Sequence, residues 1–402
     1  MGWREWFGLR PSMQDLASRI IGEFRKQGEE DWTFDTSEAT LRNSQGAIVN
    51  LANIYREYSQ SPRSGRAALL HKYSALSEMS QRSVPKLWEL AARSIYPTVR
   101  SRFDRTVSQI EFRDRPDDWP VVVVWPWIDE LEIRLVYDWG THLTQISEDV
   151  ADTWGQPLEA IRQRALQNLA ALPKPTWHPI GDGVYELVTD HSYQESLLLV
   201  DKVIDQLPFR ESVACVPSNR GVLLACDGNQ SERLVAMIKE AIRRLETQAW
   251  PLAGTVLARR GGSWQELHPA GDAAVYASDL RRYSEAITYA DQKKALEALH
   301  TKQGEDIFVA TFSLFRRPNE LAVRSWCTWA EGIHGLLPKT DFVVLGRQDE
   351  EGHADPLCIS WDRAISTLGH YMKDGGEDPP RFYVKSGFTD AEWVALKDEE
   401  QS

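Results

Sequence analysis

The feature that most constrains the fold is an alternation of apolar, strand-like segments with amphipathic helical segments between residues 121 and 248. Strands are indicated at 121–125, 128–138, 183–188, 213–216 and 222–226, and helices at 157–172, 196–207 and 231–245. Strands joined both by a tight turn and through helices favour a mixed sheet with helices packed on it. The junctions carry no glycine-rich phosphate loop, nucleophile elbow or metal-ligand motif. The pattern therefore predicts an architecture without assigning a chemistry.

The regions on either side of this unit have their own patterns. Helical spacing at 12–28, which begins with a capping-box pair at Ser12 and Asp15, and at 84–95, before Pro97, predicts a mostly helical N-terminal region over 1–115. Strand-like segments at 32–35, 47–51, 308–314, 321–329, 342–345 and 357–360 add short sheets. We expect an α+β protein with a core over 121–265, a linking helix over 266–304 and a small α+β domain over 305–402.

Composition excludes several classes of protein. The 402 residues are 42% hydrophobic, which is enough for packed cores, and their net charge of -13 disfavours general binding to nucleic acid or to an anionic membrane. We find no apolar run of membrane-spanning length, and four dispersed cysteines without a signal peptide favour reduced thiols in a cytoplasm. Cys215 and Cys226 flank one turn and are candidates to face each other. We expect a cytoplasmic protein with no cofactor.

A zinc site in the C-terminal region is a weak alternative. Cys327, His334, His353 and Cys358 include both ligand types, but their spacing has no Cys-x-x-Cys or His-x-x-x-His pair. We therefore expect no metal, and we expect the cysteines to be small buried residues.

A basic segment lies between residues 82 and 105. Six positive and two negative residues give it a charge of +4, and Arg93, Arg100, Arg102 and Arg105 are its candidates for binding phosphate or an acidic partner. A solvated helix face is the alternative, and the lack of interleaved aromatic residues disfavours nucleic acid. Residues 346–402 carry thirteen acidic and six basic residues, a net -7. This acidity indicates either a solvated surface or electrostatic steering, within the chain or toward a partner.

The most enzyme-like cluster is Asp190, His191 and Glu195, at the start of the helix expected over 196–207. A carboxylate beside an imidazole can form an acid–base pair, with Arg134 or Asp138 from a neighbouring strand in support. The competing interpretation is helix capping, since Asp, His and Ser gather at helix starts and no nucleophile is fixed opposite them.

Tryptophan is unusually frequent, with 16 copies, and most of these rings should fill the cores of the protein. Near the N-terminus, Trp3, Trp6 and Phe7 form a short aromatic arm. This arm is a candidate partner surface, and it can alternatively dock on the protein itself or on a membrane interface.

Several segments resemble the YtpQ-like family of bacterial proteins, and the resemblance covers roughly residues 10–265. The segments that resemble the family are Asp129–Asp138, Ala165–Leu169, Gly183–Tyr185, Glu195–Leu199, Val213–Pro217 and Gly221–Leu224. The resemblance implies a bacterial cytoplasmic protein of α+β type. The family has no established activity to carry onto these positions.

Two functional hypotheses follow. The first is a non-catalytic interaction or regulatory protein whose partner is another protein. The second is a hydrolase or other acid–base enzyme centred on Asp190, His191 and Glu195.

Overall fold

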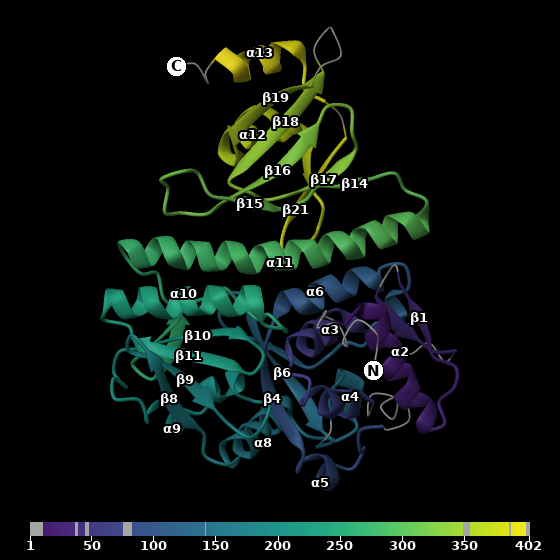
Figure 1. Ribbon diagram of the computed structural model, residues 1–402, viewed down its shortest axis with the longest axis vertical. Coiled ribbons are helices and arrows are strands. Elements are labelled where there is room, and N and C mark those ends of the chain that lie inside the picture. The colour runs from purple at the N-terminus through teal and green to yellow at the C-terminus, as the bar shows by residue number, and fades with distance from the viewer. Residues whose placement is uncertain are drawn as a thin grey trace.

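The computed structural model describes residues 11–36, 39–44, 48–74, 83–140, 142–348, 354–385 and 387–398. A long helix, α11 (Asp272–Gln303), crosses the molecule, with the C-terminal domain on one side of it and the larger part of the chain on the other (Figure 1). Helices α6 (Arg102–Glu111) and α10 (Ser231–Thr247) pack along α11 from the larger part. Helices and several separate sheets confirm the α+β class.

The N-terminal region is built around helix α2 (Met13–Lys26). It packs with α3 (Leu51–Gln60), α4 (Arg66–Ser74) and an antiparallel sheet of β1 (Thr33–Asp35), β2 (Thr40–Arg42) and β3 (Ile48–Asn50). The capping box is confirmed, because the Asp15 N–H donates to Ser12 Oγ at 3.1 Å and the Ser12 N–H donates to Asp15 Oδ2 at 3.0 Å. Leu16, Ile20 and Phe24 form the apolar stripe that this spacing predicts.

The next unit is an antiparallel sheet with β6 at its centre. Its strands are β4 (Ile95–Ser101), β5 (Val124–Pro126), β6 (Leu131–Asp138) and β7 (Leu143–Gln145), and it is followed by α7 (Glu148–Asp152) and α8 (Leu158–Ala170). The expected neighbouring strands and the helix after Pro157 are confirmed. Strand β6 is buried on both faces, so its charged residues Glu132 and Arg134 are only 3% exposed.

A six-stranded antiparallel sheet follows. Its strand order is β13-β12-β10-β11-β9-β8. The strands are β8 (Thr176–Gly181), β9 (Val184–Val188), β10 (Val213–Asn219), β11 (Val222–Asp227), β12 (Leu257–Arg260) and β13 (Ser263–Glu266). One face packs on α10 and α11, and the other on η3 (Glu195–Leu199) and α9 (Asp201–Ile204). Cys215 and Cys226 belong to the cores on opposite faces of this sheet. The expectation that they face each other is therefore wrong.

Among the described residues, the parallel strand pairs lie in the C-terminal domain, where β14 pairs with β17 and β16 pairs with β18. One sheet has β14 (Phe308–Val309), β17 (Gly335–Pro338), β20 (Met372–Asp374) and β21 (Arg381–Val384). The other has β15 (Ser313–Phe315), β16 (Arg324–Ala330), β18 (Phe342–Gln348) and β19 (Ala354–Ser360). Helices α12 (Trp361–Leu368) and α13 (Asp390–Asp398) and the turn η4 (Gly369–Tyr371) complete the domain. Trp329, Trp361 and Trp393 lie in its core, the role expected for most tryptophans.

Two expected helices are wrong in extent. Over 84–95 only α5 (Trp88–Ala91) is helical, and Ile95 already begins strand β4. Pro97 is tolerated within β4 because this strand pairs only with β6 and lies at the edge of the sheet. Over 196–207 the chain forms η3 and the single turn α9 instead of one helix. The segment 196–207 is largely buried against a sheet, and Val84, Ala91 and Ile95 of the other segment belong to the core of the β4–β7 unit, so tertiary packing overrides local helical spacing.

Helix α11 approaches the larger part of the chain most closely at Gly254. A Cβ atom at this position would lie 2.8 Å from Leu280 O, from Arg281 Cα and from Ser284 Cβ. Backbone atoms on a packed helix cannot move aside as the end of a flexible side chain can. Gly254 therefore sets the distance between α11 and the loop that precedes β12.

Replacing Gly254 with alanine is expected to lower the free energy of unfolding by about 1–3 kcal/mol, because the added methyl group overpacks this contact. Urea denaturation followed by circular dichroism measures the change. Gly22→Ala is the control, since it has open space within α2 and should gain roughly 0.4–1 kcal/mol. Equal stability of the Gly254→Ala variant and the wild type would contradict the close approach.

Within the described residues, no helix is long and apolar enough to cross a membrane. The same part of the chain contains no group of three potential metal-ligating side chains. Cys215, Cys226 and Cys327 are buried free thiols, whereas Cys358 is exposed, contrary to the expectation that the cysteines of the possible zinc site are buried.

Candidate functional site

The basic segment enters the interior of the protein where β4 passes into α6. Ser101 is the N-cap of α6, and its hydroxyl oxygen accepts from the Phe103 N–H at 3.3 Å. Arg100, one residue earlier, is 8% exposed and donates to Glu195 and, at 2.8 Å, to its neighbour's carbonyl Val99 O. Burial lowers the pKa of Arg100, while the Glu195 carboxylate opposes that shift. Arg100 is therefore a structural cation with a partner from its own chain.

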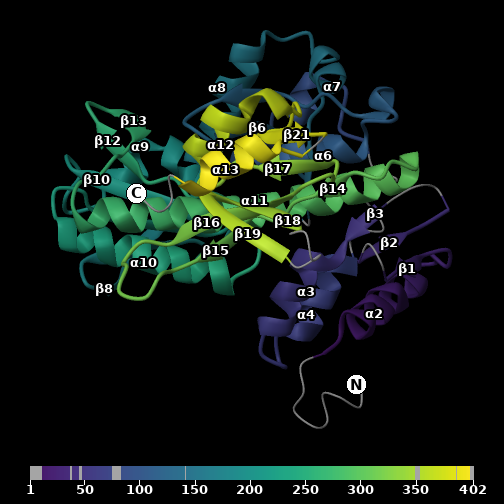
Figure 2. The ribbon, with the colours of Figure 1, turned by 90° about the horizontal axis from the view of Figure 1, so that it is seen from above.

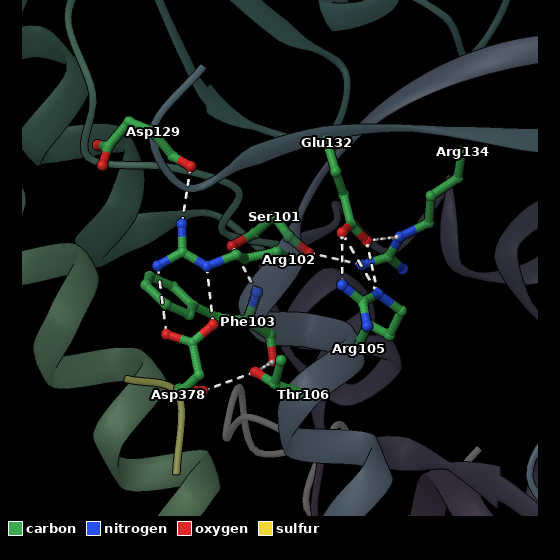
Figure 3. A network of polar contacts seen from close by, with 9 residues as sticks. All are labelled: Ser101, Arg102, Phe103, Arg105, Thr106, Asp129, Glu132, Arg134 and Asp378. Atoms are coloured by element: carbon green, nitrogen blue, oxygen red, sulfur yellow. Dashed lines mark hydrogen bonds and ion pairs between the residues drawn. The ribbon is translucent and has the colours of Figure 1, made fainter. Parts of the chain in front are cut away.

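Arg102 reaches across to the C-terminal domain (Figure 3). Its Nε lies 2.7 Å from Asp378 Oδ2 and its Nη2 lies 3.2 Å from Asp378 Oδ1, so the pair is bidentate. Its Nη1 donates to Asp129 O at 2.7 Å, and Thr106 Oγ1 donates to Asp378 O at 2.6 Å. The hydrogen bond to Asp378 raises the pKa of Arg102. Arg102 therefore binds a carboxylate of its own chain.

Arg105 binds a carboxylate on the neighbouring sheet (Figure 3). Its Nε and Nη2 lie 3.1 and 2.9 Å from the two oxygens of Glu132. Glu132 also accepts from Arg134 Nε at 2.7 Å, and Arg134 Nη2 donates to Ser101 O at 2.6 Å. One buried carboxylate between two guanidinium groups leaves a local excess of positive charge, which the neighbouring carbonyl oxygen partly compensates.

The structure therefore brings three of the four candidate arginines into one region, where each binds a carboxylate of the same chain. Arg93 differs from them, since it is exposed between α5 and β4. A second contact to the C-terminal domain joins Arg113 to Glu377, with two N–O distances of 2.9 Å. We call Arg102–Asp378 and Arg113–Glu377 the interdomain ion pairs.

The candidate acid–base cluster is not brought together as a cleft. Asp190 is exposed, whereas Glu195 is fully buried. Both Glu195 oxygens have donors, since Oε1 accepts from Arg100 and Oε2 accepts from the Gly221 N–H at 2.9 Å. Glu195 is thereby directed toward the β10–β11 turn and toward β4.

His191, which lies between Asp190 and Glu195 in the sequence, is half-buried. Its Nδ1 accepts from the Tyr193 N–H at 3.3 Å, and among the described residues its buried Nε2 has no hydrogen-bond partner. Burial lowers the pKa of His191, so the imidazole is neutral at pH 7. Tyr193 donates its hydroxyl to Asp138 Oδ2 at 2.7 Å, so Asp138 contacts a residue two positions after His191.

Sequence reasoning missed Glu130, which lies just before β6. It is buried and accepts from the Gly254 N–H at 2.7 Å and from Thr255 Oγ1 at 3.1 Å. Burial raises the pKa of Glu130 to about 7. The available signal was the charged series Glu130, Glu132 and Arg134 at every second position of an apolar strand. Such a series indicates a solvated face unless both faces are covered, and in β6 both are.

The remaining candidate residues, Trp3, Trp6 and Phe7, lie outside the described residues.

Comparison with known proteins found no matching family model, no matching curated protein and no matching solved structure. The YtpQ-like resemblance and its implications therefore remain expectations, and function has to be argued from the geometry of this chain alone.

Proposed function

We propose that this chain is a non-catalytic interaction or regulatory protein that binds another protein through its C-terminal domain. The observation that carries the proposal is that Glu195, the buried member of the candidate acid–base cluster, is held by two donors of its own chain, while Asp190 lies apart on the surface. Glu195 has no exposed surface and two fixed donors, Arg100 and the Gly221 N–H. A general acid or base must reach a proton of the substrate, which Glu195 cannot do in this arrangement.

The interdomain ion pairs give the C-terminal domain a defined orientation on the larger part of the chain. Asp378 and Glu377 precede β21, and their partners Arg102 and Arg113 lie on or next to α6. Each such partly exposed pair contributes only about 0–1 kcal/mol to stability. Their main effect is therefore on the orientation of the C-terminal domain. In that orientation, we propose, one partner contacts surfaces on both sides of α11.

Charge indicates the chemistry of the partner. Residues 346–402 carry a net -7, and the interdomain ion pairs engage only Glu377 and Asp378 from this acidic excess. A partner with a basic surface suits this domain, and opposite charges accelerate association at low salt. Added salt should therefore weaken the complex.

The test uses the full chain as bait in a lysate of its native organism, followed by calorimetry with the purified captured protein. We expect reversing the interdomain ion pairs, with Arg102→Glu and Arg113→Glu together, to weaken that binding roughly tenfold, because the repelled domain loses its orientation. Arg243→Glu is the matched control, since it disrupts only an exposed pair within α10. Equal binding by the double variant and the wild type would contradict the proposal, as would the absence of a captured protein that binds when purified.

The second candidate function is an acid–base enzyme centred on Asp190, His191 and Glu195. The observation that favours it is the buried His191 Nε2, which has no hydrogen-bond partner among the described residues. A screen for hydrolase activity should compare His191→Ala with Asp190→Ala. Loss of a measured activity in His191→Ala, with an unchanged melting temperature, would establish the enzyme and exclude the non-catalytic proposal.

A further inference from the structure

The hairpin of β12 and β13 lies beside α9 (Figure 2). A cavity is lined by residues of this hairpin and of β4, β6, η3 and α8. We infer that it binds a small organic carboxylate with a flat apolar body. This inference does not depend on the function proposed above, since none of the lining residues belongs to the interdomain ion pairs or to the Asp190–His191–Glu195 cluster.

The cavity has a suitable size and an apolar floor. Its volume is about 320 Å³, within the range of roughly 300–1,000 Å³ found for small-molecule sites. Pro97, Ile133 and Leu198 line it from three elements, and all three residues are buried. Because β4, β6 and η3 are fixed by the surrounding core, the cavity exists before any ligand arrives.

Two indole rings add flat apolar surface. Trp127 and Trp264 both line the cavity and are half-buried against the core. The Trp264 Nε1–H donates to Leu198 O at 2.9 Å, which satisfies its polar atom and fixes the ring. An aromatic or other flat ligand can therefore stack on Trp264 without leaving its indole N–H unpaired.

Arg162, on α8, supplies the charge. Its Nε is buried and has no hydrogen-bond partner among the described residues, and its ion pair with the exposed Glu159 is long, at 3.9 Å. The other charged residue at the cavity, Asp201, accepts from Arg259 at 2.7 Å, and Arg259 also donates to Asp205 at 2.6 Å. The Arg162 guanidinium lies over the Trp125 ring, 5.7 Å from its centroid, but its Nε still lacks a hydrogen-bond acceptor among the described residues. A carboxylate is the ligand group that matches the planar donors of arginine.

The hairpin turn forms the rim. Gly261 and Gly262 have φ values of 57° and 82°, as a two-residue turn between twisted strands requires. Gly262 and Ser263 line the cavity, whereas Arg260 does not, although it is exposed on the same hairpin. Arg260 therefore offers a matched control for the charge of Arg162.

The experiment titrates the full chain with 2-naphthoate and with the uncharged 2-naphthylmethanol by calorimetry. We expect 2-naphthoate to bind at one site, and Arg162→Gln to weaken its binding roughly tenfold to a hundredfold, the usual loss for a charged hydrogen bond. The same change should leave the weaker binding of 2-naphthylmethanol unaltered. Trp264→Leu should weaken both ligands, and Arg260→Gln should weaken neither.

Three results would overturn the inference. They are no saturable binding of 2-naphthoate at roughly millimolar concentration, equal affinity in Arg162→Gln and the wild type, and an equal loss in Arg260→Gln. Melting temperatures of all the variants verify that each is folded. Because Arg162 is one-third exposed, its substitution should not unfold the chain.

Discussion

Glu195→Ala is expected to lower the free energy of unfolding by about 3–5 kcal/mol, because it leaves the buried Arg100 guanidinium without its carboxylate partner. The Gly221 N–H loses its acceptor as well. Neither group can be hydrated without opening the contact between β4, η3 and the β10–β11 turn. Urea denaturation monitored by circular dichroism and by tryptophan fluorescence measures the loss.

A double variant separates the cost of an unpaired charge from the loss of packing. Arg100→Met with Glu195→Met removes both charges and keeps similar side-chain volumes, so we expect it to be more stable than Glu195→Ala. If Glu195→Ala instead lies within about 0.5 kcal/mol of the wild type, the pair is not a structural element. That outcome would return Glu195 to consideration as a catalytic residue.

Arg381→Ala is expected to have an effect of similar size, about 3–5 kcal/mol, because a buried network loses its only charged donor. Arg381 is fully buried and donates to the Gln292 side chain and to three carbonyl oxygens, Ala310 O at 2.8 Å, Tyr289 O at 3.0 Å and Leu336 O at 3.2 Å. These acceptors belong to α11, β17 and the segment after β14. Burial lowers the pKa of Arg381 to about 10, so the guanidinium remains charged at neutral pH.

The comparison for Arg381 uses two further variants. Arg381→Lys keeps a charge but lacks the planar set of five donors, so it should recover only part of the lost stability. Lys385→Ala, at an exposed position just after β21, should change stability by less than about 0.5 kcal/mol. If Arg381→Lys is as stable as the wild type, charge alone accounts for the contribution of this residue. If Arg381→Ala is as stable as the wild type, the network does not hold the C-terminal domain on α11.

Local signals were sufficient for many elements. The capping box of α2, the spacing of α8 and α10, and the turn between β10 and β11 each depend on residues within a few positions of one another. The segment 84–95 shows where this fails. Its apolar spacing is compatible with a helix, but pairing with β6, some 40 positions later, makes Ile95–Ser101 a strand.

The candidate site was less accessible to sequence reasoning. The sequence made Arg100, Arg102 and Arg105 candidates for binding phosphate or an acidic partner, and it showed an acidic C-terminal end. It also left open an electrostatic interaction within the chain between the basic segment 82–105 and the acidic segment 346–402. Asp378, the partner of Arg102, lies 276 positions away, and no pattern of spacing encodes such a separation.

The sequence by itself determined the α+β class, most helices and strands, and the sign of the charge of the segments 82–105 and 346–402. Only the tertiary structure decided which charges meet, that β6 is covered on both faces, and that Arg162 faces a cavity. The physical reason is the separation along the chain over which each interaction acts. Helical periodicity and turn chemistry act over a few residues, whereas burial and ion pairing depend on which distant segments pack together.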